Sequence, residues 1–122
     1  MKIAGLGFHS TTSAATLRDA LALLHHIPAH VAVLQNKTQI TGFQELATGT
    51  ELSVITIEEA EIIGIETPTQ SKRIQARFGT GSVAEALALV AARRYGSARL
   101  IVHRLITANG LATVALTEVQ NP

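Results

Sequence analysis

The sequence has no cysteine and no tryptophan, and aromatic residues make up only 3% of its 122 positions. Without cysteine, the chain forms no disulfide and offers no thiolate, and the redox compartment is left undecided. Because aromatic side chains are so few, a base-stacking platform for nucleic acid is not expected. The formal net charge of +1 provides no bulk attraction to nucleic acid either.

Long apolar runs are also missing. No stretch approaches the roughly 18 apolar residues that a membrane span requires. The amino-terminal residues 1–7 hold one basic residue and an apolar run too short for a signal peptide. We therefore expect a cytoplasmic protein without a membrane partner. The chain is rich in Leu, Ile, Val and Ala, so an aliphatic core within a single domain, residues 1–122, is predicted.

Strand-like and helix-like patterns alternate along the chain. Asn109-Gly110 is typical of a two-residue primed turn, which joins two strands as a hairpin. The alternation predicts an α/β single domain: a mixed, mostly parallel sheet with helices on both faces and a C-terminal antiparallel hairpin. The expected strands are 2–7, 30–34, 51–55, 100–107 and 111–119, and the expected helices lie before Pro28 (to about His26), within 37–47, over 56–63 and from Val83 to about Arg94.

Two glycines frame a threonine in Gly79-Thr80-Gly81-Ser82, directly before an alanine-rich helix. Ser82 and Glu85 fit a capping box, as do Thr56 and Glu59 earlier in the chain. Exposed N–H groups at the positive end of a helix favour an anion, which predicts an anion-binding loop. In the plainer alternative, the glycines only cap the helix and let it pack closely on the sheet.

The run Gly-Thr-Gly-Ser-Val-Ala-Glu-Ala at 79–86 resembles the signature of the CobE family, also found as the C-terminal domain of CbiG proteins in cobalamin biosynthesis. Gly5-Leu6-Gly7 lies where that family opens with Gly-x-Gly, and Lys37 lies where it has a lysine. Arg104 lies where lysine is usual. The resemblance spans nearly the whole chain, and the 79–86 motif is its specific part.

The chain also departs from the family pattern. Phe8-His9-Ser10-Thr11 replaces the usual Cys-Arg-Arg-Gly, so a thiol and two guanidinium groups are absent from the first loop. Ile40 replaces an acidic residue three places after the lysine. No role that depends on that cysteine or those arginines is carried over to this chain.

Three segments are expected to meet in one cleft, because ligands in such folds bind beyond the carboxyl ends of the parallel strands. These segments are Gly5 to Ser13, Gln35 to Lys37 and Gly79 to Ser82. The resemblance implies a precorrin-like tetrapyrrole, whose acetate and propionate groups suit hydroxyls, cations and helix N-termini. The candidate ligand-binding residues are Gly5, Gly7, His9, Ser10, Lys37, Gly79, Thr80, Gly81, Ser82 and Arg104.

The first functional hypothesis is thus a carrier or accessory protein of corrin synthesis. A second is a hydrolase, because the resemblance to CbiG-type proteins implies opening of a precorrin lactone. His9 is then the candidate base, and the catalytic residues are otherwise unknown. A third is an adaptor for other cobalamin-pathway enzymes or a homodimer, in which the alanine-rich helix packs against another subunit.

We expect neither a bound cofactor nor a metal ion. His25 and His26 are adjacent, and Pro28 interrupts any helix that would align His26 with His30. The Gly5-Leu6-Gly7 run lacks the third glycine of a dinucleotide fingerprint. A basic segment precedes the glycine motif and is expected to form the solvated face of a short helix, with contact to an acidic partner as the alternative; its residues are Lys72, Arg73 and Arg77.

Overall fold

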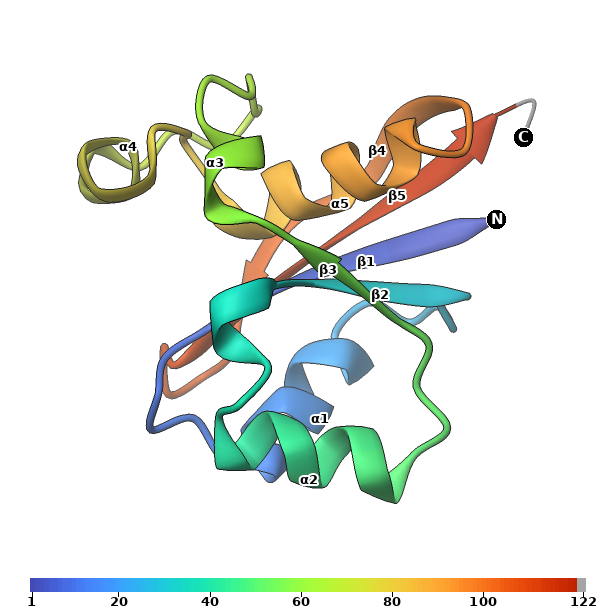
Figure 1. Cartoon of the computed structure of the whole chain (residues 1–122), viewed down its shortest axis with the longest axis vertical. Coiled ribbons are helices and arrows are strands. Elements are labelled where there is room, and N and C mark those ends of the chain that lie inside the picture. The colour runs from blue at the N-terminus through green and yellow to red at the C-terminus, as the bar shows by residue number, and fades with distance from the viewer. Residues whose placement is uncertain (121–122) are drawn as a thin grey trace.

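The computed structural model describes residues 1–120, in which five strands form one mixed sheet of order β3-β2-β1-β5-β4 (Figure 1). The three strands on one side pair in parallel, and β5 is antiparallel to both β1 and β4. The α/β class with a carboxyl-terminal hairpin is therefore confirmed, although only half of the pairings are parallel. The strands are β1 (Lys2–Phe8), β2 (His30–Leu34), β3 (Val54–Ile57), β4 (Ser97–Ile106) and β5 (Ala112–Gln120).

Helices cover both faces of the sheet, as predicted (Figure 1). Side chains alternate along β1, so that Ala4 and Leu6 pack in the core beneath α1 and α2, whereas Ile3 packs in the core beneath α5. Within residues 1–120, no helix has the length and apolar character to cross a membrane. The helices are α1 (Ala14–Ala22), the 3-10 turn η1 (Gln35–Lys37), α2 (Thr41–Gly49), α3 (Glu59–Ile62), α4 (Lys72–Phe78) and α5 (Val83–Arg93).

The alanine-rich helix α5 lies unusually close to the sheet at Gly5. A Cβ atom at that position would collide with the carbonyl oxygen of Ala84 and lie 2.7 Å from the backbone nitrogen of Ala88. The alanines of α5 that face the sheet are fully buried. Small residues on both surfaces thus place the amino-terminal end of α5 beside the carboxyl-terminal end of β1.

Several predicted boundaries were wrong, and β4, for example, begins at Ser97 rather than at residue 100. The first helix ends at Ala22 rather than near His26, because the chain reverses through His25, which has a φ of 54°, before Ala29 bonds to the carbonyl oxygen of Lys2. The third strand occupies Val54–Ile57 rather than 51–55, because its pairing with β2 runs through Ile57.

The predicted capping box at Thr56 and Glu59 was also wrong. Thr56 belongs to β3 and pairs with Val33, so the helix that follows begins later. The capping box forms instead between Glu58 and Glu61, and the Glu61 carboxylate accepts the Glu58 N–H at 2.7 Å.

The hairpin between β4 and β5 is present, but its turn differs from the predicted primed type. Primed turns require a positive φ at the first central residue or at both, whereas of Asn109 and Gly110 only Gly110 has one, with a φ of 74°. The Gly110 N–H donates to the Thr107 carbonyl oxygen at 2.9 Å, and the Asn109 side chain donates to Thr16 Oγ1 at 2.9 Å. The turn is therefore fixed against α1 by a side chain.

Replacing Gly5 with alanine should lower the free energy of unfolding by about 1–3 kcal/mol or more, because backbone atoms occupy the space of the new methyl group. Urea unfolding measures the change. Gly49→Ala is the control, since no atom lies within 4 Å of a Cβ built there, and its effect should stay within about 1 kcal/mol. An equal effect of both substitutions would contradict close packing of α5 on β1.

The Glu61 carboxylate gives a pH-dependent prediction. The pKa of Glu61 lies below its ordinary value of 4.5, mainly because its carboxylate accepts the N–H of Glu58 and, to a smaller extent, because it bonds to the Arg94 guanidinium. A lowered pKa in the folded state adds stability above the ordinary pKa, and this stability is lost as the pH falls through the folded value. The stability difference between the wild type and Glu61→Gln should therefore shrink on acidification below about 4.5.

Urea unfolding across this pH range tests the prediction, with Glu51→Gln as a control at an exposed carboxylate. A difference for Glu61→Gln that stays constant down to the acid limit would show that the carboxylate charge is not the stabilising element.

Candidate functional site

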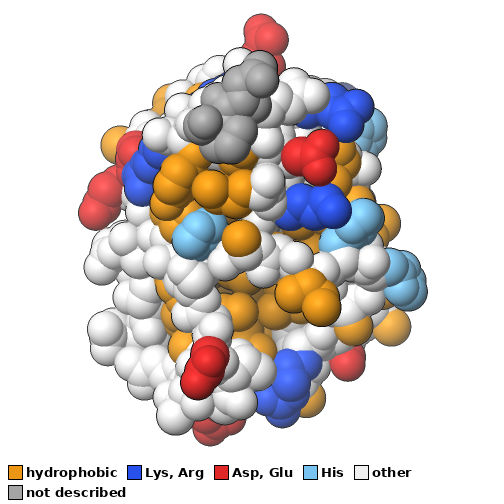
Figure 2. Space-filling view, turned by 90° about the vertical axis from the view of Figure 1, so that its right-hand side faces the viewer, with side chains coloured by type: hydrophobic (Ala, Val, Ile, Leu, Met, Phe, Trp, Pro, Cys, Tyr) orange, Lys and Arg blue, Asp and Glu red, His pale blue; other side chains and the backbone are white. Residues whose placement is uncertain are grey.

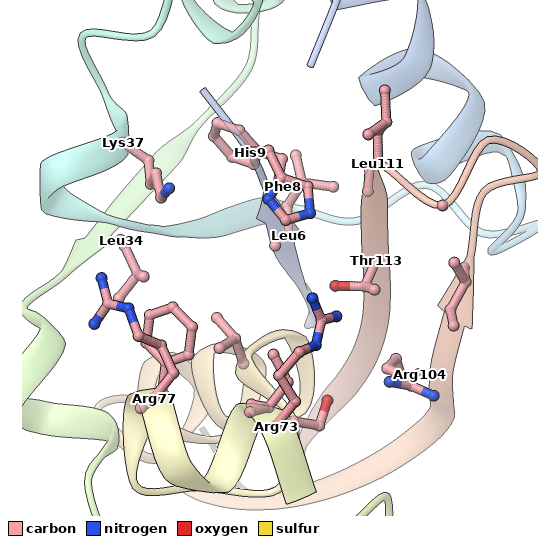
Figure 3. Close-up of a pocket in the computed structure, with 18 residues that line it drawn as sticks. Leu6, Phe8, His9, Leu34, Lys37, Arg73, Arg77, Arg104, Leu111 and Thr113 are labelled. Carbon is pink, nitrogen blue, oxygen red and sulfur yellow. The ribbon is translucent and has the colours of Figure 1, made fainter. Parts of the chain in front are cut away.

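A cavity of about 460 Å³ lies where the carboxyl ends of β1 and β2 meet α4, α5 and the hairpin (Figure 3). This volume is in the range of small-molecule sites, roughly 300–1,000 Å³. Apolar side chains form much of the surface, and Phe8 is held in place by stacking on Phe43 with ring centroids 5.7 Å apart. The apolar lining residues are Leu6, Phe8, Leu34, Ile74, Phe78, Val83, Ile106, Leu111 and Ala112.

The charged side chains that line the cavity are basic. Its charged side chains come from η1, α4 and β4, and no aspartate or glutamate among residues 1–120 lines the cavity. They lie around the apolar surface in Figure 3. By contrast, the side of the molecule in Figure 2 mixes basic and acidic side chains. The basic residues of the cavity are Lys37, Arg73, Arg77 and Arg104, together with His9.

These cations differ in their protein partners. Arg77 forms an ion pair with Glu59 at 3.2 Å, and its guanidinium lies 4.7 Å from the Phe78 ring centroid. Lys37, Arg73 and Arg104 make no salt bridge within residues 1–120. Their charges are therefore available to an anion in the cavity.

The structure brings together candidates from all three segments that the sequence placed in one cleft. Five of the ten candidate residues line the cavity, and the other five do not. The lining candidates are Gly7, His9, Lys37, Ser82 and Arg104. Those outside the lining are Gly5, Ser10, Gly79, Thr80 and Gly81.

The first part of the glycine motif holds the neighbouring loop. Gly79 has a φ of 76° and ends α4. Thr80, which is 1% exposed, donates its hydroxyl to the Ile65 carbonyl oxygen at 2.7 Å. A Cβ on Gly81 would collide with the Thr69 carbonyl oxygen. These three residues therefore fit the plainer packing interpretation, and the motif reaches the cavity only at Ser82 and Val83.

The second part of the motif forms half of the predicted capping box. Ser82 Oγ accepts the N–H of Glu85 at 3.2 Å, as expected. The predicted reciprocal bond, from the Ser82 N–H to the Glu85 carboxylate, was wrong, because this carboxylate bonds to other donors. It accepts bonds from the Thr69 N–H, the Thr69 hydroxyl and the Arg104 N–H at 2.9, 2.7 and 2.7 Å. Donors from two other segments thus take the place of the Ser82 N–H.

Sequence reasoning did not select Arg73 and Arg77 as site residues, yet both line the cavity. Their spacing of four residues places them on one face of α4. This helix directly precedes the glycine motif, so the spacing, read together with that position, is the signal that could have identified them.

His9 lies at the cavity, but its ring is without a hydrogen-bond partner among the described residues. Its backbone N–H donates to Thr12 Oγ1 at 3.0 Å, which fixes the loop rather than the imidazole. Residues 1–120 contain no group of three or more His, Asp or Glu side chains that could hold a metal ion.

The packing role of Thr80 can be tested with Thr80→Val. The substitution removes the hydroxyl of the buried Thr80 and leaves the Ile65 carbonyl oxygen without this donor, so the free energy of unfolding should fall by about 1–3 kcal/mol. Thr38→Val is the matched control, because the hydroxyl that it removes bonds to the Gln35 carbonyl oxygen at an exposed position. Urea unfolding in which both variants lose the same stability would contradict a buried structural bond at Thr80.

Comparisons with known proteins agree with the resemblance. The sequence profile of the family described as "Cobalamin synthesis G C-terminus" matches residues 2–117. The crystal structure of CobE, described as a protein from the cobalamin (vitamin B12) biosynthetic pathway, is similar at 29% identity and a TM-score of 0.82, over 98% of this chain and 91% of CobE.

The cobalamin biosynthesis protein chiG from Agrobacterium tumefaciens is similar at 26% identity and a TM-score of 0.66, over 99% of this chain and 100% of chiG. No match was found among curated protein sequences.

Proposed function

Because the chain belongs to the cobalamin synthesis G C-terminal family and has a role in cobalamin biosynthesis, we propose that it binds an anionic precorrin-type tetrapyrrole as a carrier or accessory protein. The observation that carries this proposal is the cavity with basic side chains and an apolar surface, which no acidic residue of the described part of the chain lines. A tetrapyrrole with acetate and propionate groups has the complementary chemistry: an apolar ring with anionic substituents.

The charge arrangement supports several carboxylate contacts rather than one. Lys37 on η1, Arg73 on α4 and Arg104 on β4 approach the cavity from separate elements (Figure 3). Contacts between cations and carboxylates are strong because both partners carry charge. Separated cations fit a ligand with carboxylates at different points on its edge.

The apolar surface supports the ring itself. Ile74 and Phe78 on α4 line the cavity together with Leu6 and Phe8 of β1. Burial of a macrocycle edge between these side chains contributes roughly 25 cal/mol per Å² of apolar area removed from water. The amino-terminal end of α5, at Ser82 and Val83, adds a positive dipole end beside this surface.

The geometry gives less support to the hydrolase and adaptor hypotheses. A general base requires an orienting partner or a defined place beside the reacting group, and the His9 ring has no bonded carboxylate within residues 1–120. The alanines of α5 that an adaptor would use for close contact are buried against the protein's own sheet. Binding is therefore the function that the site supports best.

Titration with uroporphyrin, a stable carboxylate-rich tetrapyrrole, tests the proposal by absorbance and calorimetry. We expect binding that weakens with added salt, since salt screens the attraction between the cavity cations and the ligand carboxylates. Lys37→Gln and Arg73→Gln should each weaken binding by about tenfold through loss of a charge-assisted contact.

Lys72→Gln is the matched control for charge. This substitution removes a single positive charge from the residue next to Arg73. Because Lys72 does not line the cavity, the affinity for uroporphyrin should change by less than about twofold. The fully esterified porphyrin, which lacks the carboxylates, should bind much more weakly. Equal binding of the acid and its ester, or equal losses in all three variants, would refute recognition of carboxylates in this cavity.

A further inference from the structure

The main chain of β4 is irregular where Arg104 lies. Val102 pairs with Leu116 and Leu105 pairs with Val114, so His103 and Arg104 together face one residue of β5, Ala115. Such a bulge removes a backbone N–H from the ladder of the sheet and redirects the side chain. The Arg104 N–H is therefore free to bond away from β5.

The bond that the Arg104 N–H makes is with a buried carboxylate. Glu85 is 0% exposed, and its Oε2 atom accepts this N–H at 2.7 Å. The Thr69 hydroxyl shares the same oxygen at 2.7 Å, and the Thr69 N–H donates to Oε1 at 2.9 Å. Burying a carboxylate is costly unless donors satisfy it, so the bulge and the carboxylate stabilise each other.

Glu85 bonds to the backbone N–H of Arg104 and not to its guanidinium. No salt bridge joins the two side chains, and Arg104 Nε is buried without an acceptor among the described residues. Arg104 lines the cavity (Figure 3). A planar guanidinium with free donors fits a carboxylate in a two-bond arrangement, which a lysine ammonium does not reproduce.

We propose that Glu85 is a positioning residue: it holds the β4 bulge so that Arg104 presents its guanidinium to one carboxylate of the ligand. This inference rests on the proposed binding function and assigns a fixed carboxylate subsite within the cavity. Lys37 lies on η1 and has no bond to Glu85 or to the bulge, so its contact with the ligand is independent of Glu85.

A double-variant cycle with uroporphyrin as the probe tests the inference. Glu85→Gln keeps the side-chain shape, but its NH₂ group replaces either Oε1, which accepts one donor, or Oε2, which accepts two, so it faces at least one of the three donors. We expect Arg104→Gln and Glu85→Gln each to weaken binding by about tenfold, and the double variant to bind no more than about twofold more weakly than Arg104→Gln alone. In a Lys37→Gln background, Glu85→Gln should retain its full tenfold effect.

The Arg104→Lys substitution distinguishes the effect of the guanidinium geometry from the effect of its charge. The ammonium keeps the charge but loses the planar pair of donors, so we expect weaker binding than in the wild type. Affinity equal to the wild type would overturn the carboxylate subsite. Equal effects of Glu85→Gln in the Arg104→Gln and Lys37→Gln backgrounds would overturn the positioning role, because a general loss of structure affects both alike.

Nuclear magnetic resonance of the wild type covers the case in which Glu85→Gln does not fold. The Nε–H resonance of Arg104 should shift when uroporphyrin saturates the protein, and its backbone amide should remain protected from hydrogen exchange. An unchanged Nε–H resonance at saturation would overturn the inference while leaving the binding function intact. No binding of uroporphyrin by the wild type would instead overturn the proposed function, and the inference with it.

Discussion

The buried carboxylate of Glu85 connects three parts of the molecule that are distant in sequence. It belongs to the first turn of α5, and its donors come from Thr69 in the loop before α4 and from Arg104 in β4. Because a carboxylate in a dry interior is stable only when its oxygens are satisfied, the loop and the bulge must both reach it. The relative positions of α4, α5 and β4, which form much of the cavity wall, depend on this set of bonds.

Close packing of α5 on the sheet supplies the second constraint. The space at Gly5 lets the backbone of α5 lie against β1, and this contact places Ser82 and Val83 near the carboxyl end of that strand. The glycine motif continues the arrangement, since Thr80 and Gly81 pack against the loop of residues 65–69. Residues that never touch the cavity therefore determine where its basic side chains lie.

The alternating patterns predict the α/β class, the two helical layers and the hairpin, because apolar periodicity reflects burial directly. The convergence of Gly7, Lys37 and Ser82 also follows from sequence, since each lies at a strand end or a helix start. The partners of Glu85 could not be predicted, because its spacing from Ser82 equally suits a capping box. The donors that reach this carboxylate depend on where the tertiary fold places Thr69 and Arg104. A sequence pattern within one helix carries no information about that placement.

Most basic side chains of the cavity come from outside the first loop. The family pattern has two arginines where this chain has His9 and Ser10, yet Arg73 on α4 extends toward the same loop (Figure 3). Arg73 and Arg104 make no ion pair with the protein's own acids within residues 1–120. Cations that gather without acidic partners repel one another and add little to the stability of the fold, so their gathering is better explained by an anionic ligand than by folding.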